Sequence, residues 1–139
     1  MSDCTGGCEC CGNDYFSNFG MVREFHRKYK VPVGKLGHKL TAVRQMLRVR
    51  LMTEELAEVI KAMQTGDYEN FAKELADLLY VVYGAADEAG IPIDSVFAEV
   101  HRSNMTKTSA KDVGGKVQKG PEYEPPDIEA ALTGRESNG

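Results

Sequence analysis

Apolar residues recur every three or four positions along much of this chain, which is the spacing of one face of an α-helix. The pattern predicts helices over residues 18–29, 39–63, 68–88 and 95–105. A short fifth helix is predicted over residues 127–132, directly after two prolines. No segment of useful length alternates at the two-residue period of a strand. The predicted fold class is therefore all-α, a four- to five-helix bundle.

Turn and capping residues mark the ends of these helices. Gly66 is placed to end the second helix, and Asp67 is placed to cap the third. Asp94 is expected to cap the fourth helix. His26 and His38 lack the spacing of a ligand pair and are interpreted as surface or packing histidines. The face of the fourth helix that is expected to point inward comprises Val96, Phe97 and Val100.

Carboxylates continue the apolar faces of the second and third predicted helices. Residues three, four and seven apart share a helix face, which groups Glu54, Glu55 and Glu58 and, separately, Glu74 and Asp77. A short turn between the two helices favours antiparallel pairing, which would bring the five acids together. Unpaired buried carboxylates are costly, so such a group needs a cation. Oxygen ligands favour Mg²⁺, with Mn²⁺ as the other possibility.

The alternative to a metal site is an ordinary solvated helix surface. Glutamate favours helices, and most helical acids simply face water. Either motif alone is better explained in this way. The two motifs together lie on apolar faces of consecutive helices, which makes a metal site as well supported as a solvated surface. On the residues alone, both interpretations stay open.

Length and charge restrict the classes of function. The chain has 139 residues and a net charge of −4, which argues against a nucleic-acid partner. The longest apolar run, residues 78–86, is too short to span a membrane, and no secretory signal is recognised, so a cytoplasmic protein is expected. The predicted organisation is a flexible segment over residues 1–14, one domain over 15–132 and a flexible tail over 133–139.

The cysteines are confined to the first eleven residues, as Cys4, Cys8, Cys10 and Cys11. Their spacing is not a standard zinc pattern, and adjacent cysteines do not easily bind one tetrahedral ion. A flexible, reduced segment is the favoured interpretation, and a small metal knot is the alternative.

Two other stretches carry a possible function. Residues 78–83 are apolar nearly all round the predicted third helix, which fits a bundle centre or a subunit interface. Residues 106–120 form a loop rich in lysine and glycine, which suits contact with phosphate. From charge alone, an ordinary solvated loop is the better interpretation of that second stretch.

Taken together, the motifs resemble those of the MazG-like, all-α nucleoside triphosphate pyrophosphatase superfamily. Its signature pairs E-E-x-x-E on one helix with E-x-x-D on the next, which correspond to residues 54–58 and 74–77. The likeness is to the phosphoribosyl-ATP pyrophosphohydrolase-like branch of phages and bacteria. It extends over about residues 16–132 through Arg50 and the segments 77–84, 100–107 and 115–127.

The resemblance implies hydrolysis of a nucleoside triphosphate between its α- and β-phosphates. It further implies bound Mg²⁺ and a homodimer or homotetramer with the pocket near the subunit interface. The implied metal ligands are Glu55, Glu58, Glu74 and Asp77. Glu54 and Glu55 are the candidate catalytic residues. Glu54 is either a further metal ligand or the base that accepts the proton of the attacking water. The candidate substrate-binding residues are Arg50, Asn104, Lys107, Lys119 and Tyr123.

Three functions are open at this point. The first is a pyrophosphatase that acts on (d)NTPs and controls the nucleotide pool. The second is phosphoribosyl-ATP pyrophosphohydrolase of histidine synthesis, which ranks lower because this chain has a longer C-terminal segment rich in lysine and proline. The third is a non-catalytic helical dimer that binds metal or nucleotide, against which the complete set of five acids argues.

Overall fold

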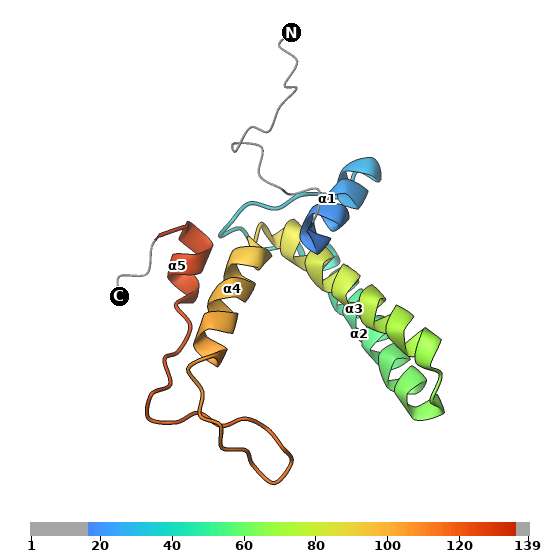
Figure 1. Cartoon of the computed structure of the whole chain (residues 1–139). Helices are drawn as coiled ribbons and strands as arrows, with labels where there is room; N and C mark the ends of the chain where they lie inside the picture. Colours follow the sequence, from blue (N-terminus) through green and yellow to red (C-terminus); the bar gives the residue numbers. More distant parts are fainter. Residues whose placement is uncertain (1–16, 136–139) are drawn as a thin grey trace, which may run out of the picture. The chain divides into compact units, whose positions relative to one another are not determined.

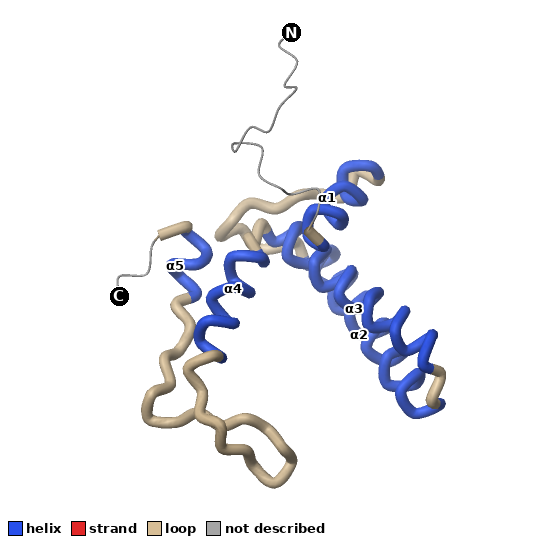
Figure 2. The backbone as a smooth tube through the Cα atoms, in the orientation of Figure 1, coloured by secondary structure: helices blue, strands red, loops and turns tan. Residues whose placement is uncertain are grey.

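The computed structural model describes residues 17–135 and contains five helices and no strand within them (Figures 1 and 2). The all-α prediction is confirmed. The predictions for Cys4, Cys8, Cys10 and Cys11 lie outside the described residues. The helices are α1 (Asn18–Lys28), α2 (Ala42–Thr65), α3 (Tyr68–Ala89), α4 (Ile93–Asn104) and α5 (Ile128–Thr133).

The chain divides into two compact units, one ending at Gly90 and the other beginning at Ile91. In the first unit α2 and α3 form a long antiparallel hairpin, and α1 packs against α3 (Figure 1). In the second unit α4 packs against α5. None of the helices in residues 17–135 combines the length and apolarity needed to cross a lipid bilayer.

The turn of the α2–α3 hairpin follows the predicted capping. Gly66 ends α2 in the left-handed conformation, at φ 71°, which glycine adopts without strain. The side chain of Asp67 accepts a hydrogen bond from the backbone N–H of Asn70 at 3.0 Å and so caps α3. This tight turn sets the register in which α2 and α3 face each other.

The predicted cap of α4 is wrong. Pro92 occupies the capping position and makes no side-chain hydrogen bond to the helix, which begins at Ile93. Asp94 lies inside the first turn instead. Proline is well suited to a helix start because its φ is fixed, and a carboxylate in the first turn interacts favourably with the helix dipole.

Charged side chains fill much of the interior where α1, α2 and α3 meet. His26 Nδ1 lies 2.7 Å from Asp87 Oδ2, and both side chains are almost fully buried. Arg48 donates to the buried carboxylate of Glu88, which also accepts from Arg44 at 2.5 Å. The ring of His26 also lies 3.3 Å from the Arg48 guanidinium. We call these five residues the buried charge network.

Gly84 leaves room for this network. A Cβ atom at this position would lie 2.6 Å from Nη1 of Arg48 and 3.3 Å from Nε2 of His26. The glycine therefore allows the guanidinium and the imidazole to approach the α3 backbone, which explains a helix-weakening residue in mid-helix.

The second unit is held by polar contacts around α4. Arg102 forms ion pairs with Glu99 at 2.9 Å and with Glu124 at 2.7 Å. Ser103 is buried, and its hydroxyl donates to the carbonyl of Glu124 at 2.7 Å. Phe97 is 69% exposed and Val100 is 37% exposed, so the prediction that these two side chains point inward is wrong, whereas Val96 is half-buried. The short α5 is the helix that packs on α4 in this unit.

Candidate metal centre

The α2–α3 hairpin brings three carboxylates together. One oxygen from each of Glu55, Glu74 and Asp77 lies within 4.8 Å of the other two. Glu55 comes from α2, whereas Glu74 and Asp77 are one turn apart on α3. Glu74 is buried and the other two are half-buried, so the cluster lies at the edge of the hairpin with access to solvent. We call these three residues the acid cluster.

A lysine neutralises part of the charge of the acid cluster. Lys73 Nζ donates to Glu74 Oε1 at 3.1 Å and to Asp77 Oδ2 at 2.7 Å. These hydrogen bonds raise the pKa of the Lys73 ammonium, so it is protonated throughout the physiological range. The sequence interpretation missed this residue, although its spacing of four from Asp77 was a usable signal.

The acids act on one another electrostatically. Partial burial raises the pKa of Glu55, and the negative charges of Asp77 and then Glu74 raise it further, against an opposing effect of Lys73. Like charges in proximity disfavour ionisation, and an added cation would relieve this cost. The cluster therefore has both the ligand type and the unbalanced negative charge of a cation site.

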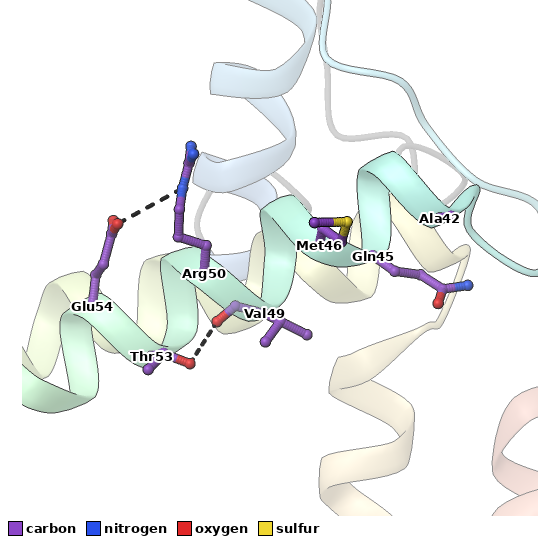
Figure 3. Close-up of a pocket in the computed structure, with 7 residues that line it drawn as sticks. All are labelled: Ala42, Gln45, Met46, Val49, Arg50, Thr53 and Glu54. Carbon is purple, nitrogen blue, oxygen red and sulfur yellow. Dashed lines mark hydrogen bonds and ion pairs between the residues drawn. The ribbon is translucent and has the colours of Figure 1, made fainter.

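Glu54 and Glu58, the other two acids expected to converge, are exposed and lie outside the acid cluster. Glu54 instead faces Arg50 on the next turn of α2, with 3.7 Å between Nε and Oε1 (Figure 3). The structure therefore assembles three of the five acids, from two helices.

Among the candidate substrate residues of the second unit, Lys119 lies over the ring of Tyr123 and Lys107 acts on the same phenol through its charge. Lys119 Nζ lies 4.6 Å from the centre of the Tyr123 ring, and the Ser103 hydroxyl lies 3.3 Å from the tyrosine oxygen. The Ser103 hydrogen bond lowers the pKa of Tyr123, and the charges of Lys119 and Lys107 lower it further. Asn104 is exposed at the end of α4. A positive field at a phenol suits an anionic ligand.

The lysine-rich loop is more ordered than the sequence indicates. Thr108 and Gln118 are joined by a backbone hydrogen bond of 3.1 Å, and Gln118 bonds to Ala110 at 3.0 Å. An isolated bridge pairs Lys111 with Val117. The segment is therefore a short hairpin-like excursion without a regular strand.

The acid cluster fits a magnesium ion by its donor set. All three side chains offer carboxylate oxygen, which is the ligand that Mg²⁺ prefers. Oxygens bound to one Mg²⁺ lie about 3 to 4 Å apart, so small side-chain rotations would bring these three atoms into range. Glu55, Glu74 and Asp77 are therefore the residues that would hold the ion, and water would complete the coordination.

Comparison with known proteins places this arrangement in a family. An all-helical fold with carboxylates facing one another from consecutive helices agrees with the MazG-like, all-α class, to which the matched family belongs. The family model described as phosphoribosyl-ATP pyrophosphohydrolase matches residues 22–104, which is more than half of the chain. The chain therefore belongs to the phosphoribosyl-ATP pyrophosphohydrolase family.

Individual relatives agree with this assignment. A protein of Rhizobium rhizogenes named phosphoribosyl-ATP pyrophosphatase is 39% identical over 64 residues, or 46% of this chain and 62% of that protein. Proteins of the same name from Rhizobium etli and Rhizobium johnstonii are each 38% identical over 64 residues. Each of these two matches covers 60% of the relative, so this chain spans about three fifths of the length of the relatives it matches. The family match contains the whole acid cluster and ends at Asn104, before Lys107, Lys119 and Tyr123.

Proposed function

We propose that this chain is a metal-dependent pyrophosphohydrolase that cleaves phosphoribosyl-ATP between its α- and β-phosphates. Water adds across this bond, so the products are phosphoribosyl-AMP and pyrophosphate. The observation that carries the proposal is the acid cluster, which joins Glu55, Glu74 and Asp77 inside the segment matched to the family. A triphosphate would be repelled by bare carboxylates, so substrate binding at this place requires a cation.

Each acid has a proposed role. Glu55, Glu74 and Asp77 would hold Mg²⁺ or Mn²⁺, and Glu58 is a further candidate from the next turn of α2. The bound ion would neutralise phosphate charge and lower the pKa of a bound water. Glu54 and Glu55 are the candidate acceptors of the water proton. Glu54 is exposed, and its 3.7 Å contact with Arg50 is a surface pair that an approaching substrate would replace.

The choice of phosphoribosyl-ATP reverses the order of the first two functions expected from the sequence. The matched family and the named relatives all carry phosphoribosyl-ATP in their descriptions, which favours this substrate over a general (d)NTP. The candidate substrate contacts stay proposals within each unit taken by itself. Arg50 belongs to the first unit, and the candidates of the second unit are Asn104, Lys107, Lys119 and Tyr123.

Pyrophosphate release from a panel of substrates tests this function. With Mg²⁺ present, we expect kcat/KM for phosphoribosyl-ATP to exceed that for each dNTP and NTP by at least about ten-fold. The reason is that dNTPs and NTPs lack the phosphoribosyl group, so a site that binds this group loses that contact with them. Preference for a dNTP would instead support the first function, a pyrophosphatase that controls the nucleotide pool. Metal binding without turnover on any substrate would support the non-catalytic alternative.

We also propose that a second copy of the chain covers the exposed face of α2. Residues at alternating spacings of three and four form a continuous stripe along this helix, and its large apolar members are exposed, Met46 by 74%. Figure 3 shows the first part of the stripe, flanked by Arg50 and Glu54. This is the heptad spacing by which two helices pair. The stripe comprises Ala42, Met46, Val49, Thr53, Leu56, Ile60 and Met63.

Changing Ile60 to glutamate is expected to produce a monomer. In a dimer, the new carboxylate within the stripe would be buried without a partner, which costs several kcal/mol. This cost outweighs the free energy gained when the α2 helices of two copies associate. Light scattering of the purified chain should give the mass of a dimer or tetramer, and the mass of one chain for Ile60→Glu. Lys61→Glu is the matched control, because it changes the net charge more but lies beside the stripe. A monomeric unmodified chain would refute the proposal.

A further inference from the structure

Lys73 is positioned where a metal ion would bind. Its ammonium donates to two of the three members of the acid cluster, at 3.1 Å to Glu74 and 2.7 Å to Asp77. The contact with Asp77 spans one helical turn, but the contact with Glu74 involves the adjacent residue and a carboxylate that is only 5% exposed. The Glu74 side of this contact is shielded from solvent, which distinguishes it from an ion pair between two exposed side chains.

The acid cluster needs this cation when no metal is bound. Three carboxylates whose oxygens lie within 4.8 Å repel one another, and the buried Glu74 cannot be fully solvated. Lys73 supplies one positive charge and two hydrogen bonds. The same ammonium would repel a divalent ion bound to those oxygens. Its hydrogen bonds would also occupy oxygen lone pairs that the ion needs for coordination.

The lysine is free to leave. Its side chain is 64% exposed, and a flexible four-carbon stem carries a strongly hydrated charge. We propose that Lys73 is an internal counter-cation, which holds the acid cluster together in the metal-free protein and swings into solvent when a divalent ion enters. This inference rests on the metal site of the proposed function.

Competition between the lysine and the metal has a distinct signature. Removing Lys73 makes the metal-free protein less stable, because the acids lose their counter-charge. It makes metal binding tighter, because the ion no longer displaces two hydrogen bonds. A lysine with only a structural role would change stability with and without metal by the same amount, since linkage requires a difference between the two states.

Titration of the full chain with Mn²⁺ alone, followed by the electron paramagnetic resonance signal of free Mn²⁺, tests the proposal. We expect Lys73→Gln to bind Mn²⁺ about three-fold to ten-fold more tightly than the unmodified chain, because the ion no longer displaces one exposed and one part-buried charge contact. Lys73→Arg keeps the charge and should bind as the unmodified chain does. Lys61→Gln removes an exposed lysine of α2 outside the cluster and should shift the affinity less than two-fold, a size of effect that long-range charge alone allows.

Thermal unfolding of the same variants supplies the second measurement. Lys73→Gln should melt below the unmodified chain in chelator, and this difference should vanish or reverse in saturating Mn²⁺. Equal or weaker Mn²⁺ binding by Lys73→Gln would overturn the role of Lys73, as would equal losses of melting temperature in both conditions. If the unmodified chain binds no Mn²⁺, the metal centre and this inference both fail.

The failure of this inference is distinguishable from failure of the proposed function. Turnover of phosphoribosyl-ATP by the unmodified chain, together with unchanged Mn²⁺ affinity in Lys73→Gln, would leave the function intact and refute the counter-cation. Tighter Mn²⁺ binding in Lys73→Gln without turnover of any substrate would support the counter-cation and refute the function.

Discussion

Changing Asp77 to asparagine is expected to abolish metal-dependent turnover while leaving the chain folded. Asparagine keeps the shape of the side chain but removes one of the three charges that the ion requires. The lost metal contribution is several kcal/mol of transition-state stabilisation, which corresponds to a decrease in kcat/KM of about 10³-fold. Initial rates of pyrophosphate release, measured at several Mg²⁺ concentrations, would show the loss and any partial recovery at high metal.

Stability separates this chemical effect from misfolding. Neutralising Asp77 removes its repulsion from Glu55 and Glu74 but also weakens its ion pair with Lys73. These two effects oppose each other, so the free energy of unfolding in chelator should stay unchanged within about 1 kcal/mol. Glu69→Gln is the matched control, because it neutralises an exposed acid in the first turn of the same helix. An Asp77→Asn chain as active as Glu69→Gln would refute the metal centre.

Local rules were sufficient to predict the helices and the turn that builds the hairpin. Gly66 and Asp67 act through the backbone of their immediate neighbours, so their effect can be recognised without knowledge of the rest of the fold. Asp94 shows the limit of such rules. An acid before an apolar run suits both a cap and a first-turn position, and Pro92 had already fixed the start of α4.

The acid cluster could be predicted only in part, because helix geometry groups residues more coarsely than a metal ion does. Positions 54, 55 and 58 fall on the same broad side of α2, yet only Glu55 meets Glu74 and Asp77 across the hairpin. A face shared by residues three and four apart spans a wide arc, whereas ligand atoms must converge within a few ångströms. The pairing of the two motifs was therefore predictable, but the membership of the cluster was not.

The buried charge network escaped prediction because its contacts are far apart in sequence. The 2.7 Å contact between His26 and Asp87 spans 61 residues, and the ion pair between Arg48 and Glu88 spans 40. A charged side chain on a helix usually faces water, so nothing in the local pattern marks Arg48 or Glu88 as buried. The close approach at Gly84 was the one local signal, since a mid-helix glycine often has a packing reason.

Changing Arg48 to methionine is expected to destabilise the first unit by about 3 kcal/mol. The guanidinium is buried and donates to Glu88, whose side chain is only 1% exposed. Removing one partner of a buried pair leaves a desolvated charge, which costs more than the pair contributes. Arg44 still bonds to Glu88, which places the expected loss at the lower end of the usual range. Urea unfolding in chelator, at one fixed protein concentration, measures the change.

Arg44→Met is the matched control for this prediction. Arg44 donates to the same carboxylate at 2.5 Å, but its side chain is 29% exposed and water can replace part of the contact. We expect a loss of about 1 kcal/mol, because hydrogen bonds to charged groups near solvent contribute little net stability. Equal losses of unfolding free energy in the two variants would show that the deeper burial of Arg48 does not make its contact with Glu88 more important than that of Arg44.

The pH dependence of the same variants tests the cause of the loss. Burial by itself raises the pKa of Glu88, but the hydrogen bonds and charges of Arg44 and Arg48 outweigh burial and hold the pKa below its ordinary value of 4.5. A lowered pKa in the folded state contributes stability above pH 4.5, which is lost as the pH falls through the folded value.

In Arg48→Met, the effect of burial on the pKa of Glu88 is opposed only by Arg44, so this contribution to stability shrinks. The difference in unfolding free energy between the unmodified chain and Arg48→Met should therefore be largest near pH 7 and decrease below pH 4.5. A constant difference across this range would mean that Arg48 stabilises the fold by packing rather than by its charge on Glu88.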